Sequence, residues 1–319
     1  MGKFFQRESE NGLMSVEIVT LIYMVVTTVM LCVWWNGINQ PQDMLMWRVG
    51  VLVYIVLANF IYHFRPCRAT ILLRIAPLFF CLVQWYPETY EFCKQFNYQD
   101  HLFAAADWTL FGCEPSIEFS RWMNGTFWYE AFHCGYYSYY YLMLAVIAFY
   151  FCARYDDFQR ASFIFLASFF IFYFIFEFLP VAGPQYYYCA LGEEAARRPE
   201  FPAMGHYFRE HTDVLPIEVR GFFSRMVLVA QEAGERPTAA FPSSHVGMST
   251  VCMMLAWQSR SRLLFWVLVP FWVMLVLATV YVKAHYAVDS IAGLLAAVLI
   301  FGLTQWLYPH AKAFFRLKN

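Results

Sequence analysis

The chain has 319 residues, of which 61% are apolar, 21% are aromatic and 14% are charged, with a net charge of −1. Soluble domains carry charge on about a quarter of their residues, so this composition indicates a polytopic membrane protein. A near-zero net charge provides no broad basic surface and gives no case for a nucleic-acid partner.

Long apolar runs recur along the chain, and a helix needs about 20 apolar residues to cross a bilayer core. The sequence therefore predicts an all-α, polytopic membrane helical bundle of about eight spans. We expect a retained N-terminal segment that leads directly into the first span, because no signal-peptide pattern precedes it. The third run is the weakest, because Arg74 and Pro77 interrupt it. The predicted spans lie near 15–35, 46–64, 69–86, 128–152, 161–181, 241–258, 263–284 and 288–307.

Basic residues in short connections set the expected orientation. They occur without acids in the connection 65–74, in the turn near 259–262 and in the tail (Lys312, Arg316, Lys318). The long connections 87–127 and 182–240 are instead acidic or mixed. With eight spans, both termini and every basic connection fall on the cytoplasmic side, so we expect an N-in, C-in topology with both long connections outside. A seven-span arrangement would separate the termini.

Three reactive side chains lie at the mouths of predicted spans. The sixth span begins at Pro242-Ser243-Ser244-His245, the seventh ends near His285, and the eighth begins at Asp289. In the predicted topology all three mouths open on the extracytoplasmic side. We therefore expect His245, His285 and Asp289 to converge on that face.

These residue types suit phosphoryl transfer. If the stretch is helical, His285 and Asp289 share a face, and the carboxylate would fix the imidazole tautomer and stabilise the imidazolium. The Ser243-Ser244 helix start presents free N–H groups that favour an anion, and His245 beside it is a candidate general acid. Taken singly, each feature also fits a solvated histidine, a helix cap or a structural hydrogen bond. Their conjunction on one predicted face favours the catalytic interpretation.

The two stretches resemble the second and third signatures of the type-2 phosphatidic acid phosphatase superfamily, with Ser244 in place of a glycine. The resemblance implies a phosphohistidine at His285, His245 as the acid and Asp289 as the orienting carboxylate. It also implies Ser243 and Ser244 at the phosphate, and it requires neither a metal nor another cofactor.

The sequence departs from that family at the phosphate-binding cations. Thr279 stands where the third signature has an arginine, and Val229 stands where the first signature has a lysine. Arg236 and Lys283 are candidates to replace these charges, since arginine forks suit phosphate. Lys283 equally fits a snorkelling residue at the end of a span.

Further stretches resemble one branch of the superfamily, fungal inositol phosphorylceramide synthase and its bacterial relatives. They are Ala240–His245, Tyr281, Gly183-Pro184-Gln185-Tyr186 and the Asp107…Gly112 stretch, and the resemblance covers roughly residues 105–305. It implies Gln185 and Tyr186 at the substrate. Gly183-Pro184 alone also reads as a turn, and the tyrosines that follow as an interfacial aromatic belt.

The sequence predicts two regions of the chain and one function. Residues 1–100 are predicted to form an N-terminal transmembrane region of about three spans plus the start of an outer loop. Residues 101–319 are predicted to form the catalytic domain, with a six-helix core and the outer loop 182–240. The predicted protein is an integral membrane lipid phosphatase or phosphotransferase whose site faces the periplasm, lumen or exterior. Its predicted partners are a lipid phosphate or phospholipid and, for transfer, a ceramide or other alcohol acceptor.

Two alternatives stay open. The first is an inositol phosphorylceramide synthase-like headgroup transferase, which differs from a phosphatase only in the acceptor. The second belongs to another class, an inactive transporter or scaffold that kept the fold, for which lost phosphate-binding cations would be the expected sign.

Other polar residues and the nine cysteines carry weaker signals. Glu130, His133 and Glu177 lie within apolar runs, where structural hydrogen bonding is the favoured interpretation. No CxxC pair occurs, so a zinc site is not expected. A disulfide is left open among four cysteines in or near the outer connections (Cys93, Cys113, Cys134, Cys189).

Overall fold

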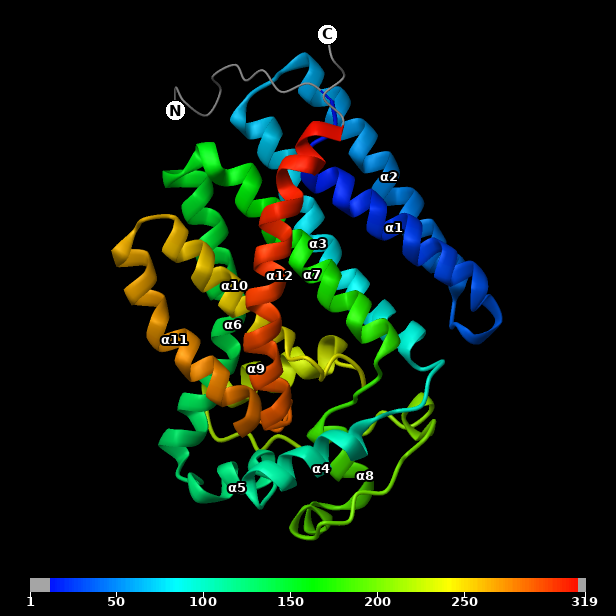
Figure 1. The fold of residues 1–319 in the computed structure, drawn as a ribbon, viewed down its shortest axis with the longest axis vertical. Coiled ribbons are helices and arrows are strands. Elements are labelled where there is room, and N and C mark those ends of the chain that lie inside the picture. Colours follow the sequence, from blue (N-terminus) through cyan, green and yellow to red (C-terminus); the bar gives the residue numbers. More distant parts are fainter. Residues whose placement is uncertain (1–11, 315–319) are drawn as a thin grey trace.

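The computed structural model describes residues 12–314, which form a long helical bundle with a cap of shorter helices and loops at one end (Figure 1). No strand occurs in this described part of the chain, which confirms the all-α prediction. The helices are α1 (Ser15–Val33), α2 (Pro41–Phe64), α3 (Arg68–Cys93), α4 (Asp100–Phe111), α5 (Pro115–Trp122), α6 (Thr126–Ala153), α7 (Phe158–Phe178), α8 (Pro184–Leu191), α9 (Phe222–Gly234), α10 (Ser244–Gln258), α11 (Arg262–Tyr281) and α12 (Ala287–Phe314).

Seven of the described helices are long and apolar enough to cross a membrane, as expected of a polytopic bundle. The eighth expected span is α10, which has 15 residues and a length of about 22 Å. It begins only at Ser244, because the Ser243 hydroxyl accepts a hydrogen bond from the Val246 N–H at 3.3 Å and caps the helix. Helix α10 is largely buried among α6, α7, α11 and α12. The shortest of the eight expected spans therefore lies inside the bundle.

The weakest predicted span, α3, continues through Pro77 to Cys93 and is 26 residues long. Arg74 is tolerated inside it because the side chain is buried against Glu17 of α1, with 2.6 Å between Nη2 and Oε2. A second buried pair joins Arg48 of α2 to Glu88 of α3, also at 2.6 Å. Charges inside membrane helices are costly unless they are paired, and these pairs tie the first three helices together.

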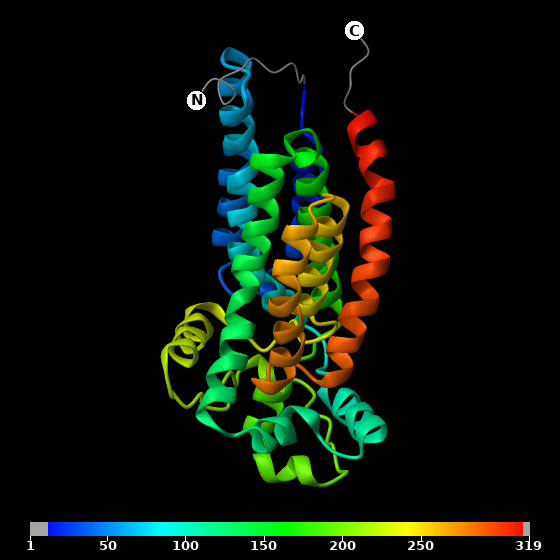
Figure 2. The ribbon, with the colours of Figure 1, turned by 90° about the vertical axis from the view of Figure 1, so that its left-hand side faces the viewer.

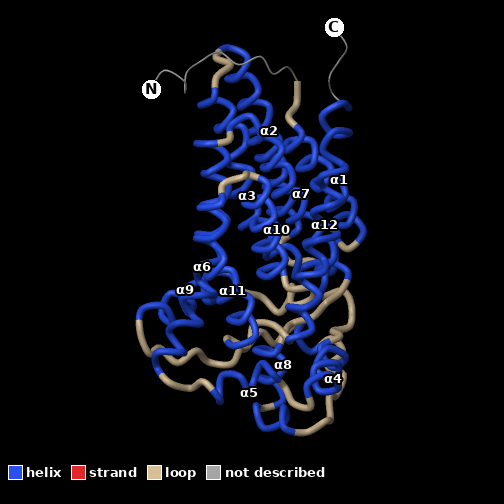
Figure 3. Tube along the Cα trace, turned by 60° about the vertical axis from the view of Figure 1, so that its left-hand side comes forward, coloured by secondary structure: helices blue, strands red, loops and turns tan. Residues whose placement is uncertain are grey.

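The two ends of the bundle differ in their connections. Short connections α2–α3, α6–α7 and α10–α11 lie toward the end where α12 finishes (Figures 1 and 2). The opposite end carries α4, α5, α8 and α9, and most of the non-helical chain gathers there (Figure 3). Arg316 and Lys318, which entered the topology prediction, lie outside the described residues. Which end faces the cytoplasm stays a prediction.

Helix α7 occupies the centre of the bundle. It packs against α1 and α3 on one side and against α10 and α12 on the other. Gly247 of α10 permits close packing here, because a Cβ at this position would lie 2.2 Å from the Phe172 ring of α7. The N-terminal turn of α10 therefore packs directly against the central helix α7.

Candidate functional site

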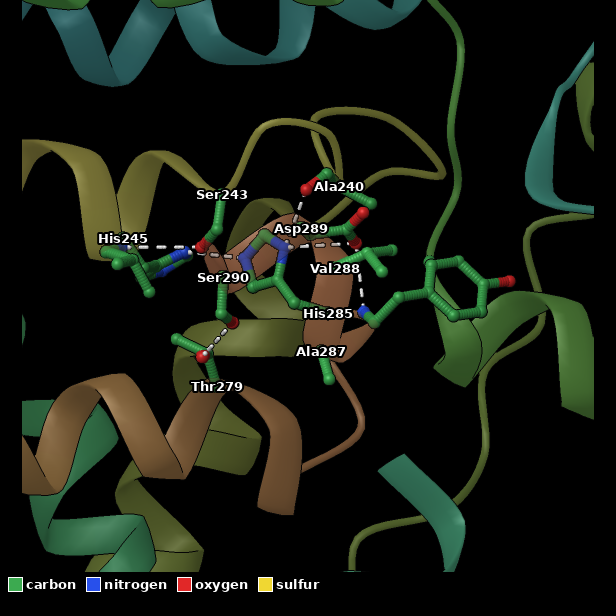
Figure 4. A network of polar contacts seen from close by, with 12 residues as sticks. Ala240, Ser243, His245, Thr279, His285, Ala287, Val288, Asp289 and Ser290 are labelled. Carbon is green, nitrogen blue, oxygen red and sulfur yellow. Dashed lines mark hydrogen bonds and ion pairs between the residues drawn. The ribbon is translucent and has the colours of Figure 1, made fainter. Parts of the chain in front are cut away.

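The structure brings the two predicted histidines into direct contact at the end of the bundle that carries the short helices α4, α5, α8 and α9. His245 lies in the first turn of α10, and His285 lies in the connection between α11 and α12 (Figure 4). The His245 Nδ1 and His285 Nε2 atoms are 3.3 Å apart. Two segments that are separated by forty positions in the chain thus present imidazoles to each other.

The second ring nitrogen of His285 has a main-chain partner. His285 Nδ1 lies 2.8 Å from the Ala240 carbonyl oxygen and 3.8 Å from Asp289 Oδ2 (Figure 4). A carbonyl only accepts, so Nδ1 carries the proton and Nε2 keeps its lone pair. Asp289 was expected to fix this tautomer, but the Ala240 carbonyl is the nearer acceptor. Helix α12 begins only at Ala287, so His285 and Asp289 do not share one continuous helix face.

Burial keeps the His285 ring neutral. The residue is 3% exposed, and loss of hydration lowers the pKa of the imidazole below its usual value near 6.5, which the hydrogen bond to Ala240 offsets only in part. A neutral ring with a free Nε2 is the form that can act as a nucleophile. In this tautomer the contact with His245 requires His245 Nδ1 to be the donor.

The starts of α10 and α12 are tied to each other. The Ser243 N–H donates to the Asp289 carbonyl at 3.0 Å. Gly293 permits this approach, because a Cβ there would lie 2.6 Å from the Ser243 carbonyl oxygen. Asp289 Oδ2 also accepts from the Tyr286 N–H at 2.9 Å, which shapes the turn that carries His285. The two helix starts thus form one rigid unit beneath the imidazoles.

A buried carboxylate from α4 supports the α12 side of this unit. Asp107 accepts hydrogen bonds from the Ala287 and Val288 N–H groups, at 2.7 and 2.9 Å. These are free N–H groups at the start of α12, where a negative charge is favourable. Burial raises the Asp107 pKa to about 6, although the two N–H groups oppose the shift.

A second carboxylate from α4 supports the neighbouring loop. Asp100 accepts from the Ala182 and Gly183 N–H groups at 3.0 and 2.8 Å, and burial raises its pKa to about 6. Gly183 has φ +98°, and a Cβ there would lie 2.7 Å from the Ala284 carbonyl oxygen, so glycine is required on both counts. Asp100 thereby fixes the Ala182-Gly183 segment, which packs against Ala284, the residue before His285.

A small cavity opens onto the two imidazoles and has room for about one water molecule, roughly 10 Å³. Two of the predicted substrate residues, Ser244 and Gln185, line it, together with His245 and His285. Glu235 also lines it, which the sequence did not indicate. The described lining residues include no lysine or arginine (Tyr86, Tyr136, Ala182, Gln185, Glu235, Thr238, Ala239, Ala240, Ser244, His245, Ala284, His285).

A larger, more open cavity of about 190 Å³ lies on the other side of Gln185. It holds Arg121, Lys283 and Arg220, and each lies against an acid; Arg121 Nη1 is 2.9 Å from Glu118 Oε1. Lys283 Nζ lies 2.9 Å from Glu193, and Arg220 Nη2 lies 2.6 Å from Glu218. Gln185 lines both cavities, so its side chain separates the charged outer cavity from the histidine pair.

The remaining predicted substrate residues lie away from the histidine cavity. Ser243 is buried as the cap of α10, and Tyr186 is buried with its ring 6.4 Å from that of Phe208. Arg236 is exposed and donates to the main-chain carbonyl of Glu235. Thr279, at the position of the missing arginine, exchanges a hydroxyl hydrogen bond with Ser290 at 3.0 Å (Figure 4).

Three other polar residues have structural partners. Glu130 accepts from the Phe223 N–H at 2.8 Å and caps α9, Glu177 accepts from the Tyr23 hydroxyl, and His133 contacts the Tyr129 carbonyl while lining the outer cavity.

The sequence left a disulfide open among four outer cysteines, and in the structure all four are free thiols. Cys93 lies buried beside Thr238, with 3.3 Å between Sγ and the hydroxyl oxygen. A small apolar residue that fills a packed position accounts for it better than a cross-link.

Comparison with known proteins identifies a family. Residues 100–303 match the PAP2 superfamily, and because this match covers most of the chain, the protein belongs to that superfamily. Membership supports a phosphatase or phosphotransferase of lipid phosphates. No curated protein and no solved structure matched the chain.

Proposed function

We propose that this protein transfers or hydrolyses lipid phosphates through a phosphohistidine intermediate on His285. The observation that carries the proposal is the contact between His245 Nδ1 and His285 Nε2, with the His285 Nδ1 proton held by the Ala240 carbonyl. It leaves a nucleophilic nitrogen and a proton donor facing one point, which is what displacement at phosphorus requires.

In the first step, His285 Nε2 attacks the phosphorus and the bond from phosphorus to the leaving oxygen breaks. His245 enters this step as the imidazolium, which the bound phosphate anion favours, and gives its Nδ1 proton to that oxygen. His245 becomes a neutral imidazole, and the leaving group departs as a neutral alcohol. His285 then carries positive charge, which the Ala240 carbonyl and the nearby Asp289 carboxylate stabilise. The rings must part for this step, because they now touch.

In the second step, an acceptor oxygen attacks the phosphorus and the bond from phosphorus to His285 Nε2 breaks. His245 takes the acceptor proton, which restores both rings. Water as acceptor makes the protein a phosphatase, whereas a lipid alcohol such as ceramide makes it a phosphotransferase of the inositol phosphorylceramide synthase type. The missing arginine at Thr279 favours a phosphodiester, which carries less charge than a monoester.

The site lies beside extramembrane helices and at the ends of apolar ones, which suits a substrate whose tail stays in the bilayer. We place this end on the extracytoplasmic side, because the short basic connections lie at the other end. An inactive scaffold would have no need to keep two histidines in contact, one of them buried.

The test is turnover by purified protein in detergent. Phosphatidate, an isoprenyl diphosphate and phosphatidylinositol would each be supplied with and without ceramide, and free phosphate and new lipids would both be followed. Phosphate release without acceptor indicates a phosphatase, and a new lipid only with acceptor indicates a transferase. Activity that survives His285→Ala would refute the phosphohistidine, and inactivity of folded protein on the whole panel would favour the scaffold.

A further inference from the structure

Glu235, at the end of α9, places a carboxylate in the cavity of the histidine pair. Its Oε1 accepts a hydrogen bond from Gln185 Nε2 at 2.5 Å, and Gln231 Nε2 donates to Gln185 Oε1 at 2.9 Å. The mechanism above gives this carboxylate no role. A carboxylate beside a phosphate is unfavourable in a desolvated site, unless the substrate brings a cation with it.

Tyrosines lie in the same cavity as this carboxylate. Tyr86 of α3 and Tyr136 of α6 line the cavity with Glu235, and the Tyr136 ring stacks on His245 with 4.8 Å between ring centroids. Tyr186 lies outside the cavity lining, but both Glu235 and the surface Arg236 act on it: burial and then Glu235 raise the pKa of its hydroxyl, and Arg236 lowers it. Tyrosines and a carboxylate that line one cavity are the residue types that bind ammonium groups.

The cavity also lacks the cations that an anionic headgroup needs. The described residues that line it include no lysine or arginine. Arg236 follows Glu235 in the chain, but its guanidinium lies at the surface and donates to the Glu235 main-chain carbonyl at 3.0 Å. Burial raises the pKa of the Glu235 carboxyl and a phosphomonoester dianion would raise it further, whereas an ammonium would favour the ionised form; the cavity offers the dianion no lysine or arginine.

We propose that Glu235, Tyr86 and Tyr136 bind the ammonium of a zwitterionic phospholipid, so that the donor is a phosphodiester bearing a choline- or ethanolamine-type headgroup. This inference rests on the proposed function, because it names the donor class for the same histidine pair. The ammonium replaces the Gln185 amide nitrogen, which now occupies the position in front of the Glu235 carboxylate. Displacement of Gln185 also supplies space that the cavity now lacks.

The charges then compensate each other during transfer. The ammonium neutralises Glu235, and the imidazolium that forms at His285 faces the phosphoryl group. The leaving alcohol is diacylglycerol, and the amine-bearing phosphoryl group stays on His285 until the acceptor oxygen takes it.

The experiment first measures binding, which does not depend on turnover. Glycerophosphocholine and glycerophosphoethanolamine would be titrated into the full-length protein in detergent, beside glycerol phosphate and glycerophosphoinositol. We expect the two amine compounds to bind at least about tenfold more tightly than the two anions. Glu235→Gln should abolish that difference, whereas Glu232→Gln, an exposed glutamate on the same helix, should keep it.

A second pair of variants guards against a folding defect in Glu235→Gln. Tyr86→Phe keeps the aromatic face and should keep the preference, whereas Tyr86→Leu should lose it. Equal or tighter binding of the anions by the wild-type protein, or an unchanged preference in both Glu235→Gln and Tyr86→Leu, would overturn the inference.

Diacylglycerol release from four donors with the same acyl chains separates the two proposals. The donors are phosphatidylcholine, phosphatidylethanolamine, phosphatidate and phosphatidylinositol. One outcome would keep the phosphohistidine and reject the amine site. In it, His285→Ala abolishes turnover, the protein prefers phosphatidate or phosphatidylinositol as donor, and Glu235→Gln does not change that preference. If amine compounds bind through Glu235 but turnover survives His285→Ala, the amine site stands and the phosphohistidine falls.

Discussion

Replacement of Asp107 by asparagine tests whether the start of α12 positions the nucleophile. The asparagine side chain has the same shape, but an amide NH2 replaces one of the two carboxylate oxygens, so only one of the Ala287 and Val288 N–H groups keeps its acceptor. The freed N–H lies two or three residues from His285. We expect the connection that carries His285 to shift or to become more mobile.

The magnitudes decide which effect is visible. A hydrogen bond to a charged group contributes about 1.5–3 kcal/mol, so the loss of one bond and the weakening of the other cost about 3 kcal/mol. Burial of the charge opposes this, because it raises the Asp107 pKa to about 6 even against the two N–H groups, and a neutral asparagine carries no such desolvation cost. The two contributions have opposite signs, so the change in folding stability should be small.

Catalysis has no such compensation, since a displacement of about 1 Å can lower a rate by about a hundredfold. We therefore expect Asp107→Asn to reduce kcat by about tenfold or more, while the Tm in detergent changes by less than about 5 °C. The assay is diacylglycerol release at saturating donor, with Tm measured on the same preparation.

The control is Ser261→Ala, which removes the cap of α11 at the other end of the bundle, where the Ser261 hydroxyl accepts from the Leu264 N–H. This variant should lower Tm and leave kcat unchanged. The reasoning would be refuted if Asp107→Asn kept full kcat, or if it lost kcat only in proportion to Tm as Ser261→Ala does.

Three further predictions follow from the site. Asp289→Asn should lower kcat by about 10- to 100-fold, far less than His285→Ala, because the Ala240 carbonyl still holds the tautomer; equal losses in a steady-state assay would contradict this. The lowered pKa of His285 means that the unfolded chain binds a proton more readily than the folded one, so Tm should fall as pH drops below about 6.5, and His285→Asn should flatten that dependence. Arg236→Ala should change KM by less than about threefold, since its guanidinium lies outside the cavity, and a larger rise would restore it as a phosphate ligand.

The sequence was informative where the signal is local or periodic. Apolar runs of span length predicted the bundle, and they also placed His245 and His285 at mouths that open at the same end. The span at 241–258 was predicted too long, because hydropathy does not register that Ser243 caps the helix rather than continuing it.

The rest depended on contacts between distant segments. Asp107 lies 180 positions from the Ala287 N–H that it caps, and Asp100 lies 82 positions from Ala182. Contacts between residues this far apart follow no sequence periodicity, so the sequence could not predict them. Asp107 was noted only through its resemblance to one branch of the superfamily. Glu235 gave no signal, because an acid at the end of an amphipathic outer helix normally faces solvent.

The position of Gln185 bears on the choice between hydrolysis and transfer. Its side chain separates an open, charged cavity of about 190 Å³ from a histidine cavity with room for about one water. Water that entered freely from the outer side would hydrolyse a phosphohistidine, and a barrier of this kind reduces that access. A headgroup that displaces the Gln185 side chain occupies the space that this side chain leaves, so water is still kept out while the headgroup is bound. If the proposed phosphohistidine forms, we infer that this arrangement retains it until an acceptor alcohol arrives from the bilayer, which favours transfer over hydrolysis.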